Sequence, residues 1–198
     1  MTAAPSPPPA GIPSELRPTL PDWAQVTPER LHHIQRVAEL VVQWSERMGV
    51  PDSERNRWLK AVWLHDALRD APADQLASYA PSSAALPALL HGPASAALAK
   101  AAGETDRGVL DAVRYHSVGL AEWDMVGRVL YCADFLESGR TGLGPERAAL
   151  AERFPAEPDF VLLSVARRRM LQLIESGWQV PQPTLRFWNS LAAASSSR

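Results

Sequence analysis

Four polar side chains stand where the apolar stripes of predicted helices would otherwise continue, and this pattern constrains the fold most strongly. His33 precedes Val37 by four residues, a spacing that places both side chains on one face of a helix. The same spacing of three or four residues recurs at three further positions: His65 after Val62, His116 after Val113, and Asp134 after Leu130. Such stripes pack into a shared core, so these polar groups are predicted to meet there.

Start and stop signals divide the chain into short helical segments. Thr27-Pro28 supplies a capping hydroxyl and a proline at the first helical position, and Gly49 to Pro51 ends the same segment. Alternation of apolar and polar residues, the mark of a half-buried strand, is absent. The sequence therefore predicts an all-α fold, a single helical bundle. The predicted helices cover residues 28–48, 53–66, 73–79, 93–102, 106–116, 123–137, 144–153, 159–176 and 184–192.

The polar groups on these stripes are of the types that bind divalent metals, imidazole through nitrogen and carboxylate through oxygen. His65 is followed directly by Asp66, which adds a second carboxylate. A single polar residue on an apolar face is usually a core residue with a hydrogen-bond partner. Several on separate helices each need a partner, and one shared ion satisfies them together. We therefore expect a metal site at the core.

Both ends of the chain have the composition of tails. Eight of the eighteen prolines fall within the first thirty residues, among Ala, Ser and Thr, which is typical of a segment without a packed core. We expect a flexible tail over residues 1–26, one domain over residues 27–191, and a second flexible tail over residues 192–198.

Composition excludes several classes of function. The formal net charge of −2 and the lack of a basic block argue against a nucleic-acid-coating protein. Arg167-Arg168-Arg169 is the one dense basic run, and in a helical pattern it is predicted to lie on a solvated face. No apolar run is long enough to span a membrane. Cys132 is the single cysteine, which excludes an internal disulfide and favours a reducing cytoplasm.

The order His33, His65-Asp66, Asp134 resembles the H…HD…D order of metal ligands in the HD-domain phosphohydrolases. Other stretches are similar to one branch of that superfamily, the YqeK-type symmetrical dinucleoside tetraphosphatases of bacteria. These stretches are Leu90-His91-Gly92-Pro93, Ala112 to Gly119, Leu130 to Arg140 and Thr184 to Asn189. The resemblance runs from Thr27 to Ser190. It implies an all-helical HD domain that cleaves diadenosine tetraphosphate, or a related dinucleoside polyphosphate, at its centre to give two ADP.

The resemblance also implies a transition metal, with iron favoured, and a set of ligands. Those ligands are His33, His65, Asp66 and Asp134, and Asp66 is also a candidate catalytic residue. The segment Arg30-Leu31-His32-His33 fits the R-x-x-H start of the family, which selects His33 over His32. Two roles stay open for His91 and His116. They either bind a second ion about 3.5–4 Å from the first or act as catalytic, substrate-binding groups that face the phosphate chain.

Cationic side chains beside these motifs suit the phosphates of such a substrate. Arg69 and Arg140 are the strongest candidates, because each lies within six residues of a proposed ligand, and Arg69 is also a candidate catalytic residue. For each arginine taken singly, a salt bridge is an equally good interpretation. The other substrate-binding candidates, next to the same motifs or in the C-terminal one, are Arg30, Arg114, Ser117 and Thr184.

The chain departs from the family pattern at Arg69, where the family has lysine after H-D-x-x, and at Ser117 and Val118, where it has threonines. A planar guanidinium is not equivalent to a compact ammonium at a phosphate site. Three functions therefore stay open: symmetrical tetraphosphate cleavage, another HD-type nucleotide phosphohydrolase, and a weakened module that senses nucleotide or metal. The sequence is compatible with a homodimer.

Overall fold

A computed structural model describes residues 20–81, 87–140 and 144–196 of the chain. The described part is helical and contains no strand, which confirms the predicted all-α fold. The α-helices are α1 (Pro28–Met48), α2 (Asp52–His65), α3 (Ala73–Tyr79), α4 (His91–Ala101), α5 (Arg107–Tyr115), α6 (Met125–Leu136), α7 (Gly144–Arg153), α8 (Pro158–Glu175) and α9 (Gln182–Ser196), with a 3₁₀ turn at Pro87–Leu89.

Helix α1 begins and ends where the sequence signals predict. The Thr27 hydroxyl accepts a hydrogen bond from the backbone N–H of Arg30 at 3.2 Å, and Pro28 occupies the first helical position. At the other end Gly49 adopts the left-handed conformation, with φ of 62°, which closes the last turn. His33, Val37 and other residues of the apolar stripe are buried. The spacing of the stripe therefore directs His33 inward.

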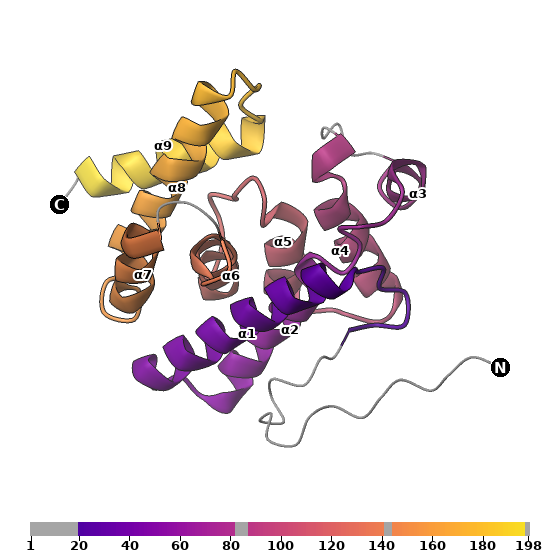
Figure 1. Cartoon of the computed structure of the whole chain (residues 1–198), viewed down its shortest axis with the longest axis horizontal. Coiled ribbons are helices and arrows are strands. Elements are labelled where there is room, and N and C mark those ends of the chain that lie inside the picture. The colour runs from indigo at the N-terminus through magenta and orange to yellow at the C-terminus, as the bar shows by residue number, and fades with distance from the viewer. Residues whose placement is uncertain (1–19, 82–86, 141–143, 197–198) are drawn as a thin grey trace.

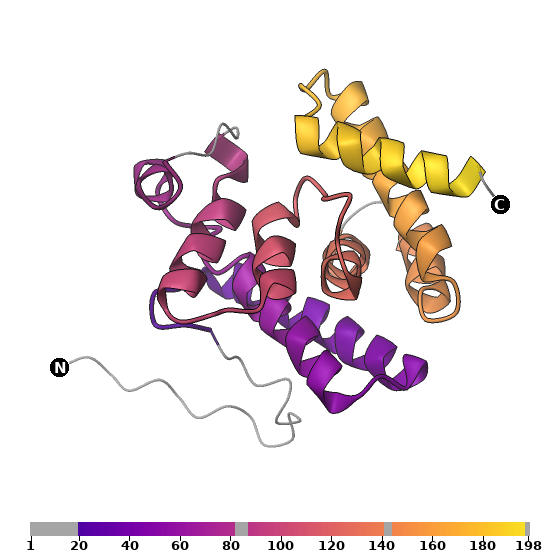
Figure 2. The same ribbon diagram turned by 180° about the vertical axis from the view of Figure 1, so that it is seen from behind.

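Helices α1, α2, α5 and α6 pack against one another and build the main core. Figures 1 and 2 show them between two ends of the molecule, with α3 and α4 at one end and α7, α8 and α9 at the other. Val62, Val113 and Leu130 are almost fully buried in this core. Each precedes His65, His116 or Asp134 on its helix. The stripes therefore converge as the sequence predicts.

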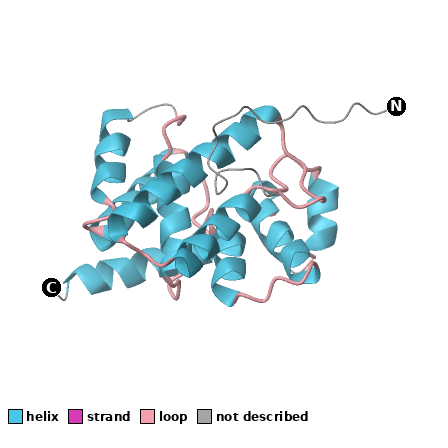
Figure 3. Ribbon diagram, turned by 90° about the horizontal axis from the view of Figure 1, so that it is seen from below, coloured by secondary structure: helices cyan, strands magenta, loops and turns pink. Residues whose placement is uncertain are grey.

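The described part of the chain consists of helices and loops (Figure 3). Val161, Leu162 and Val165 of α8 belong to the main core, and α9 joins it through an aromatic contact. Phe187 of α9 packs edge-on against Trp123 and Tyr131, with ring centroids 5.3 Å from each. Gly119, with φ of 85°, lies beneath this ring, and a Cβ there would lie 2.2 Å from Phe187 Cδ1. Glycine is thus required at this turn for both conformation and space. No helix in the described part of the chain has the length and apolar content that a membrane span requires.

The limits of the helical domain differ from those expected from composition. Residues 1–19 of the predicted N-terminal tail lie outside the described residues, but Leu20 and Val26 pack against the main core and Trp23 against a smaller one. The backbone N–H of Gln25 also donates to the Ala67 carbonyl at 2.7 Å. At the other end α9 continues to Ser196, so the predicted boundary at residue 191 falls inside a helix. Apolar residues between the prolines, and an alanine run with high helix propensity, explain both differences.

Candidate metal centre

The helix ends bring six predicted site residues together at one buried centre. His33 lies on α1, and Asp134 lies in the last turn of α6. The other four stand at helix ends: His65 ends α2, Asp66 follows it, His91 begins α4, and His116 follows α5. All six are buried. The structure thus assembles the predicted ligands and the two additional histidines in one place.

Asp66 lies between two pairs of histidines. Its Oδ2 atom is 3.7 Å from Nε2 of His33 and 3.6 Å from Nε2 of His65. Its Oδ1 atom is 3.3 Å from Nε2 of His91 and 3.5 Å from Nε2 of His116. Each pair forms with Asp66 a group whose donor atoms all lie within 4.8 Å of one another, as metal ligands do. We call these groups the His33–His65 side and the His91–His116 side.

Hydrogen bonds fix how three of the rings face the centre. Nδ1 of His65 lies 2.7 Å from the Val62 carbonyl and Nδ1 of His116 lies 2.8 Å from the Val113 carbonyl. A carbonyl oxygen only accepts, so Nδ1 carries the proton in both rings and the Nε2 lone pair faces inward. In His33 the Nδ1 atom lies 3.1 Å from a carboxylate oxygen of Glu137. These are the tautomers in which histidine binds a metal through Nε2.

The donor set on the His33–His65 side fits a bound cation. The Nε2 atoms of His33 and His65 are buried and make no hydrogen bond within the described part of the chain. Asp134 Oδ1 lies 3.2 Å from His33 Nε2 and adds a carboxylate to this side. Unpartnered buried ring nitrogens are costly, and a transition metal coordinated by imidazole and carboxylate would satisfy them.

The surrounding charge distinguishes His33 from the other histidines. Burial opposes protonation of His33, but its partners Asp134 and Glu137 outweigh this and raise its pKa to about 9. Burial lowers the pKa of His65 to about 4 and also lowers the pKa of His91. Two carboxylates therefore make the surroundings of His33 strongly attractive to positive charge. A metal at this position would take the place of the His33 proton.

On the His91–His116 side the two Nε2 atoms lie within hydrogen-bond distance of each other, whereas Nδ1 of His91 is buried and has no hydrogen-bond partner within the described part of the chain. Nε2 of His91 lies 3.0 Å from Nε2 of His116, which carries no proton when the ring is neutral, so His91 donates. The hydroxyl of Ser117 lies 3.1 Å from the same His116 atom. His91 Nε2–H and the Ser117 hydroxyl are donors of the kind that phosphate oxygens accept, whereas neutral His116 presents the lone pair of Nε2.

Glu137 also belongs to the centre, although the sequence did not identify it as a site residue. Its side chain is 1% exposed, and it joins His33 to Arg36, whose Nε atom donates to Glu137 Oε2 at 2.5 Å. The backbone N–H of Gly139 donates to the same oxygen at 2.6 Å. A carboxylate on the outer ring nitrogen orients a metal-binding histidine and raises its basicity. The available signal was its position three residues after Asp134, on the same helical face.

Arg169 was also missed, and the prediction that its basic run lies on a solvated face is wrong at this residue. Its side chain is only 17% exposed and donates to Asp134 Oδ2 at 2.7 Å. Arg167 is exposed and Arg168 pairs with Glu146, as a solvated face requires. Arg169 follows the buried Val165 by four residues, so helical spacing directs it inward.

The predicted substrate-binding residues lie at different distances from the centre. Arg30 donates to Asp66 Oδ2 at 2.8 Å, and Arg140 donates to Asp134 Oδ1. Arg69 donates to the Ala88 carbonyl at 3.3 Å and lies near enough to His91 to help lower its pKa. Two candidates take no part in the centre: Arg114 is exposed, and Thr184 on α9 is buried with no hydrogen-bond partner for its hydroxyl in the described residues.

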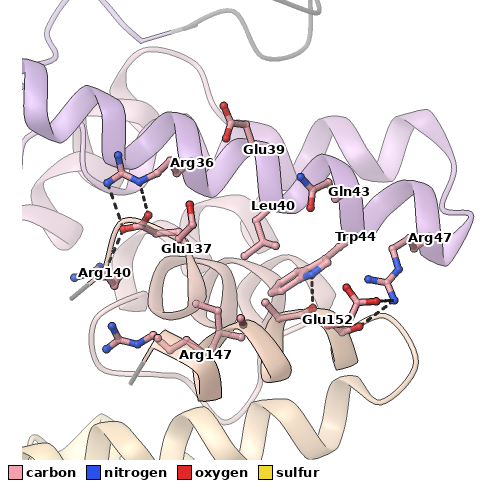
Figure 4. Close-up of a pocket in the computed structure, with 15 residues that line it drawn as sticks. Arg36, Glu39, Leu40, Gln43, Trp44, Arg47, Glu137, Arg140, Arg147 and Glu152 are labelled. Carbon is pink, nitrogen blue, oxygen red and sulfur yellow. Dashed lines mark hydrogen bonds and ion pairs between the residues drawn. The ribbon is translucent and has the colours of Figure 1, made fainter. Parts of the chain in front are cut away.

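A pocket of about 340 Å³ opens beside the centre, between α1, the end of α6 and α7 (Figure 4). Arg36, Glu137 and Arg140 line it next to the centre, and Arg147 lines it from α7. None of the six centre residues is among its lining residues. The pocket is therefore adjacent to the outer side of His33, where Glu137 separates it from the ring.

Comparisons with known proteins agree with this geometry. Residues 30–139 match the model of the HD domain. Two curated relatives are named symmetrical bis(5'-nucleosyl)-tetraphosphatase. The one from Bacillus subtilis is 29% identical over 86% of this chain and 94% of its own length. The one from Staphylococcus aureus is 26% identical over 79% of this chain and 84% of its own length.

A solved structure shares the fold. It is described as a predicted HD superfamily hydrolase involved in NAD metabolism, from Clostridium acetobutylicum. It superposes with a TM-score of 0.74 at 21% identity and covers 85% of this chain and 92% of that chain. The family match contains His33, His65, Asp66 and Asp134 and spans more than half of the 198 residues. The chain belongs to the HD domain family.

Proposed function

We propose that this protein is a metal-dependent hydrolase that cleaves diadenosine tetraphosphate, and related dinucleoside polyphosphates, symmetrically to give two ADP. The observation that carries the proposal is the double set of donors around Asp66. It occurs in a chain that aligns along most of its length with two symmetrical tetraphosphatases. The relatives specify the substrate class, and the donors supply the chemistry that its anhydride bond requires.

The His33–His65 side would hold the ion, with His33, His65, Asp66 and Asp134 as ligands and iron as the favoured metal. A transition metal bound there supplies an activated water near neutral pH and positive charge against the phosphate oxygens. Asp66 keeps one oxygen on that side and presents the other to His91 and His116. A second ion between these two histidines is the alternative arrangement, with Asp66 as the shared ligand.

The remaining residues would bind and orient the substrate. His91 and His116 would face the phosphate chain, where His91 Nε2–H is a candidate hydrogen-bond donor to the phosphate oxygens. Ser117 adds a hydroxyl next to them. Arg69 acts on His91 and Arg140 bonds to Asp134, so each cationic fork is associated with a different residue of the centre. Arg30 and Thr184 are retained as weaker substrate-binding candidates.

The direct test is product analysis with diadenosine tetraphosphate in ¹⁸O-labelled water. We expect two ADP, with label in one of them, and no reaction by Asp66→Ala protein. Formation of AMP and ATP would contradict symmetrical cleavage. If metal-replete protein turns over none of a panel of dinucleoside and mononucleoside polyphosphates, the nucleotide- or metal-sensing function replaces this proposal, and Arg69→Lys tests whether activity returns.

The proposed partners follow from the same function. The substrate is a small nucleotide, so neither nucleic acid nor a membrane is required. A cytoplasmic location stays a prediction from the single cysteine, Cys132. The homodimer stays a prediction that measurement of the molecular mass in solution would test.

A further inference from the structure

We infer that Arg169 of α8 is a positioning residue for the metal ligand Asp134. The inference rests on the proposed metal centre, in which Asp134 is a ligand. Arg169 lies outside the 30–139 segment that matches the HD domain. Helix α8, in the C-terminal part of the chain, would therefore also contribute a residue to the centre.

The guanidinium of Arg169 is fixed on several sides. Its carbon lies 4.4 Å from the ring centroid of Tyr131 and 5.5 Å from that of Phe135. From this position Nη2 donates to Asp134 Oδ2 at 2.7 Å and to the Tyr131 carbonyl at 3.3 Å. Both hydrogen bonds come from the one atom Nη2, and the planar guanidinium that lies over the two rings is the feature that lysine, a point charge, does not reproduce. The side chain is thus held in one orientation before any ligand binds.

This arrangement determines which oxygen of Asp134 faces His33, where the ion would bind. Arg169 occupies Oδ2, so Oδ1 is directed to the position 3.2 Å from His33 Nε2. Arg140 also reaches Oδ1, but its side chain is 40% exposed, against 17% for Arg169. Arg169 is therefore the buried anchor of the carboxylate, and Arg140 is the partner on the solvent side.

The neighbouring residue provides a matched control. Arg168 has the same side chain on the same helix, but its guanidinium pairs with Glu146 of α7, and both side chains are about two-fifths exposed. Arg168→Met and Arg169→Met remove the same charge and the same number of atoms, one residue apart. A general effect of charge or of helix α8 would appear in both variants, whereas positioning of Asp134 would appear in Arg169→Met alone.

The experiment loads the purified full chain with Co²⁺, whose visible absorption spectrum reports the geometry of its ligands. Competition with a chelator gives the affinity. We expect Arg169→Met to alter the spectrum and to weaken Co²⁺ binding by about 10- to 100-fold, the usual effect of losing a partner of a metal ligand. Native protein and Arg168→Met should give the same spectrum and the same affinity. Circular dichroism confirms that each variant has native helical content.

An unchanged spectrum and affinity in Arg169→Met would overturn the inference while leaving the metal centre in place. Tighter Co²⁺ binding would also overturn it, because the guanidinium would then act only by repelling the ion. If Arg169→Met does not fold, Arg169→Lys decides, since it keeps the charge and loses the planar group over the two rings; native binding by this variant would overturn the inference. Failure of native protein to bind Co²⁺ would contradict the metal centre itself.

Discussion

The two sides of Asp66 contain the same residue types but differ in what surrounds them. On the His33–His65 side the Nε2 atoms lack hydrogen-bond partners in the described chain, and Asp134 and Glu137 add negative charge. On the His91–His116 side the Nε2 atoms bond to each other and to Ser117, and the unpartnered ring nitrogen is the outer Nδ1 atom of His91. The comparison teaches that buried imidazoles alone do not define a cation site. The surrounding carboxylates and the unpartnered Nε2 atoms are the basis on which we propose the ion for one side and the phosphates for the other.

Asp66→Ala removes the group that both sides share and is expected to have the largest effect. The ion should be lost, and turnover should fall by at least about 10²–10⁴-fold, the scale of lost acid–base and electrostatic catalysis. Metal analysis and steady-state kinetics test this. Asp70→Ala is the matched control, because Asp70 shares the partner Arg30 with Asp66 but otherwise bonds to Thr27. Full metal occupancy in Asp66→Ala protein would contradict the assignment.

His65→Ala and His116→Ala separate the two sides. His65→Ala should empty the site, because it removes a ligand whose Nε2 has no other partner. His116→Ala should keep the metal and lower turnover by about 10²–10⁴-fold through lost help to the phosphates. Metal content per chain is measured beside the rate. A fall from two ions to one in His116→Ala protein would establish the second-ion arrangement, and equal metal loss in both variants would remove the distinction.

Arg69 tests the phosphate role of the His91–His116 side alone. Charge-assisted hydrogen bonds are worth about 1.5–3 kcal/mol, so Arg69→Ala should lower kcat/KM by about 10- to 100-fold without changing metal content. Arg69→Lys should retain substantial activity, because it keeps the charge. Arg114→Ala, which alters an exposed arginine, serves as the control. If the kinetics of Arg69→Ala protein are native, Arg69 does not bind phosphate, and its role is the structural hydrogen bond to the Ala88 carbonyl.

Glu137→Gln tests the His33–His65 side alone and should have the smallest effect. The amide can still accept from His33 Nδ1 but no longer adds negative charge, so metal affinity should fall by about 10-fold. Chelator competition measures the change, and Glu39→Gln, on the exposed face of α1, is the control. An unchanged affinity would show that Glu137 serves only to join α1 to α6.

Helical spacing was sufficient to predict the bundle and most of the centre. His33, His65, His116 and Asp134 could be found because each continues an apolar stripe on its own helix. Glu137 and Arg169 follow the same spacing rule, but a charged residue at a helix end or in a basic run resembles a solvated one. Their partners come from distant segments, 104 residues apart for His33 and Glu137. Only the packing of α1 and α8 against α6 reveals these contacts.

The role of Thr184 could not be predicted for a related reason. Thr184 lies in a stretch that resembles the C-terminal motif of the family's sequences. Its hydroxyl, however, is buried without a hydrogen-bond partner among the described residues. Its position depends on how α9 packs through Phe187, a contact that local sequence does not encode. The pattern identifies a residue type, whereas the fold determines what that residue touches.

The location of the ion tests the central claim most directly. Anomalous X-ray scattering at the absorption edge of the bound metal, measured on crystals of the purified full chain, locates each ion without reference to activity. We expect the strongest peak among His33, His65, Asp66 and Asp134. A peak only between His91 and His116, or no peak in a protein that hydrolyses diadenosine tetraphosphate, would contradict the assignment of the metal to the His33–His65 side.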